Sequence, residues 1–312
     1  MEIIHSLKHF EPLTSSVLTI GSYDGIHRGH HEILSAVVNH AHARHVPSVL
    51  VTFDPHPRHI LDPNADKLSL IMSMDQKMEI VESLGIDLLY VINFTESFSK
   101  TSAHDFLDKS IVPFFNPEYL IVGYDHHFGN QRDGSPQFLD EYCMHRSIGL
   151  EIIQPISDDG HSISSSRIRE LIQDGFVRRA NFELGSVFGF MAAVIYGVGR
   201  GKELNFPTAN VIPVEKNQLM PKPGVYFTRG RIIGLQAYGM CNFGTRPTFD
   251  EHELVLEIHF FHDELDNLYG KEIRVEFLER IRDEKKFPSP EELKSQLQKD
   301  KLRCLELQGK YE

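Results

Sequence analysis

The hydrophobic pattern of this chain changes once, near residue 175, and no other feature constrains its fold as strongly. Before that point, short apolar runs alternate with segments of helical period. Beyond it, apolar and polar residues alternate in short runs separated by Gly, Pro, Asn or Asp. A chain of 312 residues is long enough for two domains that each bury a core. We therefore expect an α/β domain followed by an all-β domain.

The first part predicts a parallel sheet covered by helices. Its apolar runs lie at residues 17–20, 49–53, 88–92, 119–122 and 150–153. Predicted helices follow these runs: one after Gly29, one from a capping box at Ser73 and Gln76, two near 103–112 and 135–147, and one from Ser164. Five successive βα units are typical of a parallel sheet with helices on its faces.

The second part predicts an antiparallel barrel with a terminal helix. Six strands are expected at residues 186–196, 206–212, 224–230, 232–242, 253–261 and 271–279, and one helix at about 290–305. The helical period is lost after Gly175, so we place the boundary near 176–185. The predicted domains are residues 1–178 and 183–312.

Composition excludes several classes of partner. Lys and Arg number 32 against 44 Asp and Glu, and a net charge of −12 has the wrong sign for binding nucleic acid or an anionic membrane. The three cysteines are odd in number and lack CxxC spacing, which indicates a reducing compartment and no zinc site. The start has no signal-peptide pattern and no run reaches membrane-spanning length, so we expect a cytoplasmic protein.

The run from Gly21 to His31 is the first candidate site. It follows the first predicted strand, at the sheet edge where such folds bind ligands. His27 and His30 lie at the start of the next helix, where free N–H groups and the helix dipole favour a phosphate. Imidazole donors there can stabilise charge on phosphorus during nucleotidyl transfer. Two alternatives remain: histidines without a role, or metal ligands, for which this spacing needs further ligands.

Ser164, Ser165 and Arg169 form a second group in the first domain. The serines open a predicted helix, so their hydroxyls and the exposed amides can hold a phosphate, and Arg169 can pair with the same anion one turn later. The alternative is an ordinary helix cap with a solvated arginine. Phe53 and Phe128 can contact a flat ring, although such residues more often lie in a core.

The second domain has a glycine-rich basic loop before a Pro-Thr-Ala-Asn segment. Gly199 allows close approach of the backbone to a phosphate, and Arg200 and Lys202 supply positive charge. In an extended segment Thr208 and Asn210 face the same side, where two neutral oxygens suit Mg²⁺. The Walker A spacing is absent, and a plain strand start after a flexible loop explains the segment equally well.

Glu257 lies on the polar face of a predicted strand of the second domain. Leu254, Leu256, Ile258 and Phe260 alternate onto one face of a predicted strand, which must be core, so Glu257 faces the other way. By pattern alone it is a solvated carboxylate.

Four motifs, in this order along the first half of the chain, resemble those of a known enzyme family. The run Gly21–His30 resembles the GxFDGxHxGH signature of the HxGH nucleotidyltransferases, with Tyr23 for the usual Phe. With segments 52–57, 122–134 and 163–169 it resembles the FMN adenylyltransferase half of prokaryotic bifunctional FAD synthetases. The resemblance implies a Rossmann-like domain in which His27, His30 and Arg169 stabilise the transferred charge. It also implies nucleotide contacts from Gly21, Tyr23, Asp24, Gly29, Ser164 and Ser165, and flavin contacts from Phe53, Asp125 and Phe128, with His126 where the family usually has an aromatic.

The Pro-Thr-Ala-Asn element is similar to the flavokinase signature, and segments 242–249, 256–259, 268–270 and 281–287 extend the match. Asn205 stands where family members usually have glycine. The resemblance implies a six-stranded barrel in which Glu257 takes the proton from the riboflavin 5′-hydroxyl and Arg282 and Phe287 belong to a loop over the flavin. Gly199, Arg200 and Lys202 would bind ATP, and Thr208 and Asn210 would bind Mg²⁺.

The two resemblances together imply an enzyme that makes FMN from riboflavin and then FAD from FMN, with ATP as co-substrate of both steps. Its partners would be the small molecules riboflavin, FMN and ATP. Two other hypotheses stay open: a barrel that senses flavin without turnover, and a first half that activates another phosphate ester. The sequence does not indicate an oligomeric state.

Overall fold

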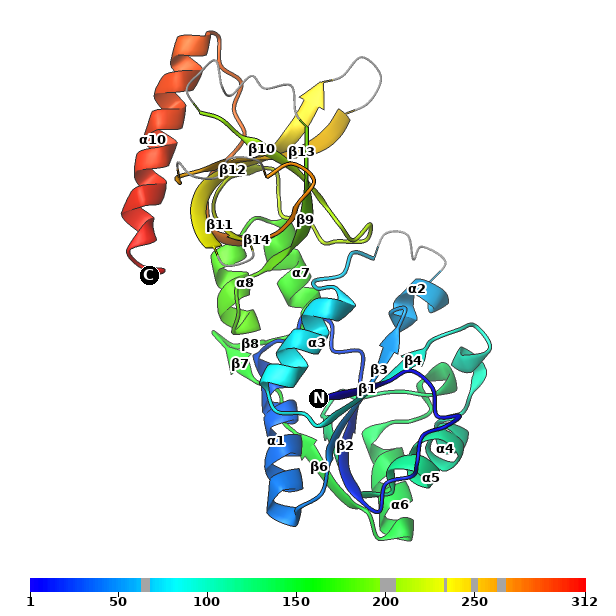
Figure 1. Ribbon diagram of the computed structural model, residues 1–312. Coiled ribbons are helices and arrows are strands. Elements are labelled where there is room, and N and C mark those ends of the chain that lie inside the picture. The colour runs from blue at the N-terminus through cyan, green and yellow to red at the C-terminus, as the bar shows by residue number, and fades with distance from the viewer. Residues whose placement is uncertain (63–67, 197–205, 233–234, 248–251, 263–267) are drawn as a thin grey trace. The chain divides into compact units, whose positions relative to one another are not determined.

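The computed structural model describes residues 1–62, 68–196, 206–232, 235–247, 252–262 and 268–312. The chain divides into two compact units, Met1–Ser165 and Ser166–Glu312, each with its own sheet (Figure 1). The predicted fold class, a parallel α/β sheet followed by an antiparallel barrel and a terminal helix, is confirmed.

The first unit is built on a six-stranded parallel sheet in the order β1-β4-β3-β2-β5-β6. Five of these strands were predicted; the three-residue β1 was missed because it is too short to show a period, and it pairs with β4 at the sheet edge, Ile3 opposite Leu89. The strands are β1 (Glu2–Ile4), β2 (Ser16–Ile20), β3 (Ser48–Asp54), β4 (Leu88–Asn93), β5 (Pro117–Gly123) and β6 (Gly149–Ile153).

Helices cover both faces of this sheet, and alternate strand residues enter two separate cores (Figure 1). Leu50 and Ile121 pack with α1 (Arg28–Arg44) and α3 (Met74–Ser83), whereas Val51 and Val122 face the opposite core. The predicted capping box at Ser73 and Gln76 is present at the start of α3. The opposite core is covered by α4 (Ala103–Phe106), the π-helix Leu107–Ile111, α5 (Val112–Phe115) and α6 (Pro136–Arg146).

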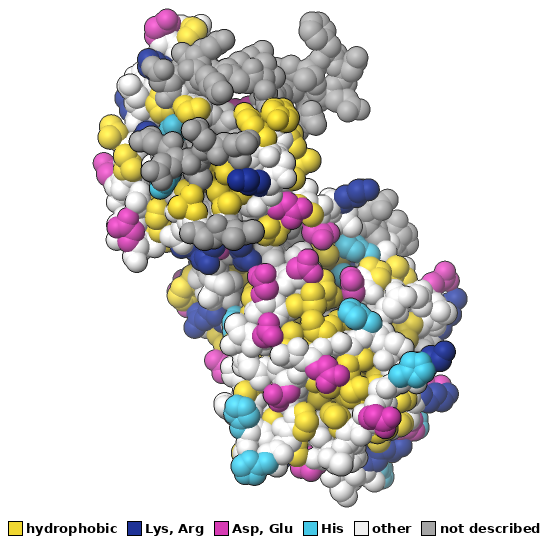
Figure 2. Space-filling view, viewed as in Figure 1, with side chains coloured by type: hydrophobic (Ala, Val, Ile, Leu, Met, Phe, Trp, Pro, Cys, Tyr) yellow, Lys and Arg dark blue, Asp and Glu magenta, His cyan; other side chains and the backbone are white. Residues whose placement is uncertain are grey.

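Shorter elements complete the first unit. They are α2 (Pro57–Leu61), the 3₁₀ turns Phe98–Lys100 and Asn130–Arg132, and a two-stranded hairpin of β7 (Ser157–Asp158) and β8 (His161–Ser162). Figure 2 shows acidic side chains and histidines spread over the visible face of this unit. That view agrees with the sequence, in which 15 of the 18 histidines lie before residue 180.

The second unit is a closed six-stranded antiparallel barrel, as predicted, and its strand order is β10-β13-β12-β11-β14-β9. Helix α10 (Pro290–Gln308) packs on its outer wall, where Cys304 and Leu307 share a core with Phe227 and Met240. The strands are β9 (Gly189–Ile195), β10 (Ala209–Pro213), β11 (Gly224–Ile232), β12 (Leu235–Pro247), β13 (His252–Phe260) and β14 (Glu272–Arg282).

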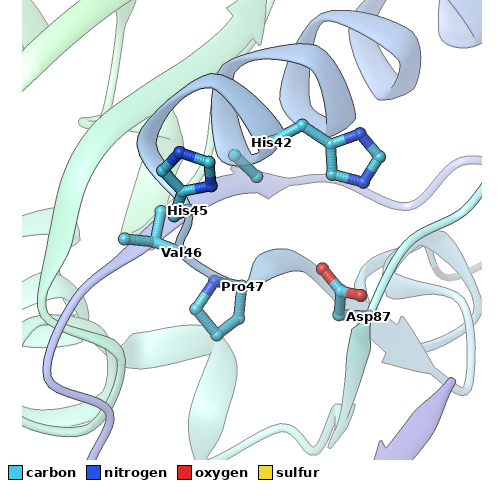
Figure 3. Close-up of a pocket in the computed structure, with 6 residues that line it drawn as sticks. His42, His45, Val46, Pro47 and Asp87 are labelled. Atoms are coloured by element: carbon cyan, nitrogen blue, oxygen red, sulfur yellow. The ribbon is translucent and has the colours of Figure 1, made fainter.

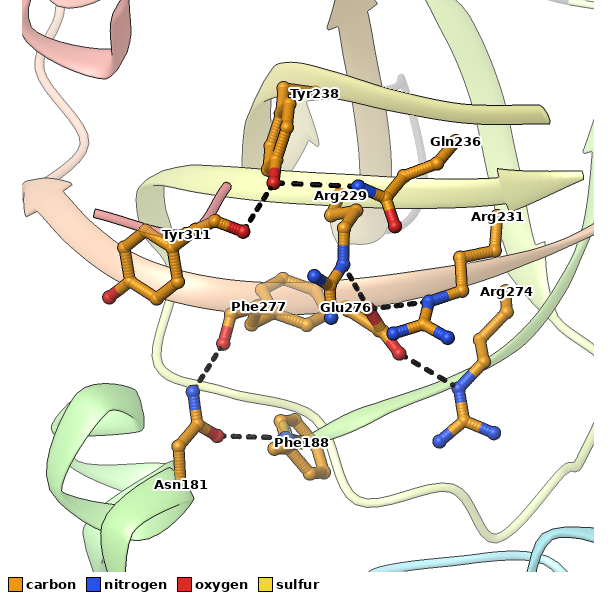
Figure 4. A network of polar contacts seen from close by, with 10 residues as sticks. All are labelled: Asn181, Phe188, Arg229, Arg231, Gln236, Tyr238, Arg274, Glu276, Phe277 and Tyr311. Carbon is orange, nitrogen blue, oxygen red and sulfur yellow. Dashed lines mark hydrogen bonds and ion pairs between the residues drawn. The ribbon is translucent and has the colours of Figure 1, made fainter. Parts of the chain in front are cut away.

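The expectation that helical structure ends after Gly175 was wrong. Helix α7 (Ser165–Gln173) is followed by a second helix, α8 (Val177–Leu184), which packs against β14. The Asn181 amide donates to the Phe277 carbonyl at 2.9 Å and accepts from the Phe188 N–H at 2.8 Å (Figure 4). Eight residues, only two turns, gave too few apolar positions for the period to be recognised.

A buried carboxylate links three arginines on the barrel wall (Figure 4). Glu276 Oε2 lies 2.6 Å from Arg229 Nε and 3.2 Å from Arg231 Nε, and its Oε1 lies 3.2 Å from Arg274 Nε. A lone buried carboxylate would be strongly destabilising, whereas this arrangement compensates its charge. The network therefore holds β11 and β14 in register.

Candidate active sites

The loop between β2 and α1 lies at the carboxyl edge of the parallel sheet, where the strand order changes direction. β3 and β5 lie on opposite sides of β2, so the chain returns across β2 when it enters β5. Ligands of open α/β folds bind at such a switch point. The topology therefore places the run from Gly21 to His31 where the sequence predicted a site.

His27 and His30 form a stacked pair at the start of α1. Their ring centroids are 3.7 Å apart with an interplanar angle of 17°. His27 caps the helix, and its Nδ1 accepts a hydrogen bond from the His30 N–H at 3.4 Å. An accepting Nδ1 leaves the proton on Nε2, which can act as a donor. A Cβ on Gly29 would lie 3.1 Å from the His27 ring, so glycine makes room for this cap.

Burial keeps His30 neutral. Desolvation, followed by the proximity of His27 and Lys77, holds the pKa of His30 well below its usual value of 6.5. Its Nδ1 is buried and has no hydrogen-bond partner among the described residues. A neutral imidazole with one unused nitrogen is suited to donating a hydrogen bond to a ligand rather than to carrying a charge.

The buried side chains of Tyr23 and Asp24 stabilise the loop between β2 and α1. The Tyr23 hydroxyl lies 2.7 Å from Thr19 Oγ1, and a Cβ on Gly21 would lie 2.7 Å from the Tyr23 ring. The Asp24 carboxylate accepts from the N–H groups of Ile71 and Met72 at 3.1–3.4 Å. Both side chains are buried and support the loop; their predicted nucleotide contacts stay predictions.

Lys77 was missed by the sequence analysis. It lies in α3, 5% exposed, and its Nζ donates to the Ser22 carbonyl at 2.7 Å and lies 3.5 Å from Thr52 Oγ1. Burial lowers its pKa from 10.5 to about 8. The available signal was its position four residues before Val81, on the buried face of the helix.

The serine and arginine residues of the second group begin α7. Ser165 Oγ donates to the Asp24 carbonyl at 2.7 Å, which ties the start of α7 to the loop after β2. Arg167 is held by the fully buried Glu183 of α8, with Nε 3.0 Å from Oε1. Ser164 and Arg169 are partly exposed. Arg167 and Arg169 therefore differ in role. Arg167 joins α7 to α8 through Glu183, whereas Arg169 is the predicted anion ligand.

The aromatic residues predicted to contact a flavin lie mainly in a core. Phe53 and Phe128 are each 8% exposed, and both pack in the same core as Phe106, with centroid distances of 6.5 and 5.8 Å. Asp125 is exposed, just after β5. Burial lowers the pKa of His126 to about 4, and its ring lies 5.3 Å from Phe128. His126 is therefore a neutral flat ring, which explains how it can stand in an aromatic position.

In the barrel, strand register brings Asn210 directly opposite Glu257. Asn242 pairs with Glu257 from the other side, so three polar residues of β10, β13 and β12 form one row. Paired side chains share a face at about 4.5–5.5 Å between Cβ atoms. Leu256 and Ile258 are buried on the opposite face, as predicted. Asn242 was not among the predicted site residues; its signal was only its place in the family-like segment.

A residue of β13, the strand of Glu257, also stabilises the segment that carries Thr208. His259, two residues from Glu257, lies 2.9 Å through Nδ1 from the Pro207 carbonyl and packs edge-on against Phe206. Burial lowers the pKa of His259, so it is neutral and donates this hydrogen bond. Thr208 follows at once and is partly exposed. The hydroxyl of Thr208 and the amide of Asn210 are hard oxygen donors of the kind Mg²⁺ prefers.

Arg282 lies on β14, near the row of Asn210, Glu257 and Asn242, and binds helix α10. Val225 of β11 pairs with both Asn242 and Arg282, and the Arg282 guanidinium binds Asp300 of α10 at 2.7 Å. Asp300 is 2% exposed, so this ion pair is sheltered from solvent. The Arg282 guanidinium also lies 5.7 Å from the centre of the Phe287 ring. The structure thus brings Arg282 and Phe287 together; Gly199, Arg200 and Lys202 lie outside the described residues.

A hollow of about 590 Å³ lies elsewhere, at the amino ends of β3 and β4 (Figure 3). His42, His45, Pro47 and Asp87 line it, on the edge opposite the loop after β2. Within the described residues there is no cluster of three or more His, Cys, Asp or Glu that could hold a metal ion.

Known proteins resemble both units. The FAD synthetase family profile matches residues 10–167, and the riboflavin kinase profile matches residues 184–307. A bifunctional riboflavin kinase/FMN adenylyltransferase of Bacillus subtilis is 32% identical over 298 residues, covering 95% of this chain and 93% of that protein. One of the same description from Escherichia coli is 31% identical over 307 residues, covering 98% and 96%. A solved structure described as a macrolide-efflux protein from Streptococcus pneumoniae has a TM-score of 0.87 at 30% identity and covers 96% of both chains.

Proposed function

This chain belongs to the family of bifunctional riboflavin kinases/FMN adenylyltransferases, and from that premise we propose how its residues divide the two reactions. The enzyme phosphorylates riboflavin to FMN with ATP and then adenylylates FMN to FAD with release of pyrophosphate. We assign the adenylylation to residues 1–178 and the phosphorylation to residues 183–312.

In the barrel, Glu257 is the general base of the kinase reaction. It takes the proton of the riboflavin 5′-hydroxyl as that oxygen attacks the γ-phosphorus of ATP and ADP leaves. The observation that supports this assignment is the strand register, in which Asn210 lies opposite Glu257. The register places an amide oxygen that can bind a metal ion beside the proposed base. Thr208 and Asn210 would hold Mg²⁺, which would neutralise phosphate charge. Arg282 and Phe287 would bind the flavin.

In the first domain, a phosphate oxygen of FMN attacks the α-phosphorus of ATP and pyrophosphate leaves. His27 and His30 donate hydrogen bonds to the phosphates at the start of α1, and Arg169 supplies positive charge. The stacked geometry of the pair and the neutral His30 imidazole support this role, because a donor already in place needs little reorganisation when charge develops. Asp125, Phe53 and Phe128 would bind the flavin, and the loop and serine residues would bind ATP.

A cytoplasmic location fits these substrates. Cys143, Cys241 and Cys304 are all buried free thiols, and burial raises the pKa of Cys143 to about 11. Such thiols are inert and suit a reducing compartment. In the described parts of the chain, no helix is long and apolar enough to cross a membrane. We propose that the enzyme's partners are riboflavin, FMN and ATP, with no nucleic acid among them.

Chromatography of the products formed from riboflavin, ATP and Mg²⁺ tests this function. Purified protein should form FMN first and FAD later, and chelation of Mg²⁺ by excess EDTA should abolish both. Formation of FAD from supplied FMN, with riboflavin left unchanged, would support the hypothesis of a flavin-sensing barrel instead.

A further inference from the structure

The buried ammonium of Lys77 lies behind the loop that carries the two histidines. We propose that Lys77 is a positioning residue for adenylyl transfer: it fixes the backbone of this loop at Ser22 and places a buried positive charge near His30. The inference rests on the proposed role of the His27–His30 pair, and its test is designed to separate the two.

Lys77 connects three elements through one side chain. From α3 its Nζ donates to the Ser22 carbonyl at 2.7 Å, in the loop after β2, and lies 3.5 Å from Thr52 Oγ1 in β3. Ser22 stands between Gly21 and Tyr23, and Tyr23 has a φ of 48°. A backbone in this unfavourable conformation persists only where its surroundings hold it. The Lys77 hydrogen bond is one of the contacts that do so.

Packing alone does not require a cation at this position. An ammonium that is 5% exposed loses most of its hydration, and an apolar chain of the same length would fill the space without that penalty. Asp24 and Asp54 favour the charged form of Lys77, yet burial outweighs them and lowers its pKa. A costly buried charge next to predicted ligand-binding groups indicates a functional requirement.

The charge acts on His30 and on the phosphates. Burial is the main cause of the depressed pKa of His30, and the positive charge of Lys77 adds to it after His27. The transferred phosphates are anionic, and a fixed cation behind the loop favours them without the mobility of a solvent-exposed lysine. Removing the charge should therefore slow the chemical step more than it weakens substrate binding.

Lys77→Met and Lys77→Arg test the inference in the full-length protein, with Lys109→Met as the matched control. Lys109 is an exposed lysine of the same unit, its side chain 71% accessible. We expect Lys77→Met to lower kcat for FAD formation from FMN by about 100-fold, with KM changed less than threefold. Riboflavin phosphorylation and the melting temperature should not fall, and Lys77→Arg should recover part of the activity. A kcat within threefold of wild type, or parallel losses of kcat and melting temperature, would overturn the proposal.

The pH profile gives a readout that a purely structural lysine would not move. The charged and titratable groups around Lys77 are Asp24, Asp54 and His30. Because the pKa of Lys77 is about 8, wild-type kcat for adenylylation should decline as the pH rises through 8, and Lys77→Arg should keep its kcat up to pH 9.5. Identical alkaline limbs in the two proteins would contradict the role of the charge.

His30→Ala distinguishes failure of this inference from failure of the underlying assignment. If His30→Ala abolishes FAD formation and Lys77→Met does not, the loop is the adenylylation site and only the role of Lys77 is rejected. If neither variant slows FAD formation, the assignment of the loop itself is wrong.

Discussion

Two histidines at a helix start have different chemistry when their rings are stacked and withdrawn from solvent: His27 is buried, and the Nδ1 of the partly exposed His30 is buried. His27 uses one nitrogen to cap α1, and His30 is held neutral beside it. Neither therefore behaves as the solvated histidine that the spacing alone allows. At the residue scale, we propose that this arrangement makes a common sequence pattern into a preorganised donor pair.

His30→Ala should lower FAD formation from FMN by roughly 100-fold, the scale for losing one preorganised donor. Riboflavin phosphorylation in the same protein should continue, because the kinase residues lie in the barrel. His42→Ala, an exposed residue of the same helix, is the control and should leave both rates unchanged. Steady-state rates with each flavin measure the effect; equal loss of both activities would point to misfolding.

Glu257→Gln keeps the shape of the side chain and removes its basicity. Riboflavin phosphorylation should fall by about 10²–10⁴, the usual contribution of positioned proton transfer, while riboflavin binding changes little. Adenylylation of supplied FMN should be unaffected. Glu272→Gln alters an exposed carboxylate of the same barrel and serves as the control. Full kinase activity in Glu257→Gln would leave Glu257 as a surface carboxylate.

The depressed pKa of Lys77 also predicts how stability depends on pH. The unfolded chain binds this proton up to about pH 10.5, whereas the folded state releases it near pH 8. Unfolding therefore takes up a proton between these values, and the free energy of unfolding should rise with pH, by about 2 kcal/mol from pH 7.5 to 9.5. Urea titrations of wild type and Lys77→Met isolate this contribution. An equal pH dependence in both proteins would show that Lys77 does not titrate there.

At the scale of elements, α8 is a helix too short to be recognised from the sequence pattern, yet it packs against the barrel. Val177, Ala180 and Leu184 are buried, and Asn181 satisfies one N–H and one carbonyl of the barrel chain. On its other side, Glu183 holds Arg167 and Arg179. The boundary predicted near 176–185 coincides with this helix, whereas the compact units meet at Ser165 and Ser166.

Asn181→Ala should destabilise the barrel unit by about 2–4 kcal/mol, because it removes two hydrogen bonds and leaves two backbone groups without their partner. Asn181→Asp should cost less, since its carboxylate still accepts from the Phe188 N–H but cannot donate to the Phe277 carbonyl. The urea midpoint for loss of riboflavin phosphorylation measures both. Equal midpoints for Asn181→Ala and wild type would show that α8 contributes little to the barrel.

At the scale of the whole molecule, the two activities should be separable. Residues 166–312 form a compact unit that includes α7, α8 and the barrel. Expressed alone, this fragment should phosphorylate riboflavin and leave FMN unadenylylated. A fragment that ends at residue 180 would cut α8 before Asn181, so a complementary fragment for adenylylation should extend past Gly185, the left-handed cap of α8. FAD formation by residues 166–312 would contradict the assignment of the two domains.

The sequence by itself determined the sheet type of each part, the order of most elements and the positions of the residues proposed for both sites. These follow from local information: alternation in β13 separates Glu257 from Leu256 and Ile258, and the motif around His27 and His30 requires only the strand before it and the helix after it. The short β1 and α8 were missed, because three and eight residues carry too little of a period.

Only the tertiary structure decided which polar residues meet. The row of Asn210, Glu257 and Asn242 depends on strand register, and Lys77 reaches Ser22 only because α3 packs under a loop 55 residues earlier in the chain. Burial likewise set the protonation of His30, His126 and Lys77. Neither register nor desolvation is encoded in local pattern, because both arise from contacts between segments that are distant in sequence.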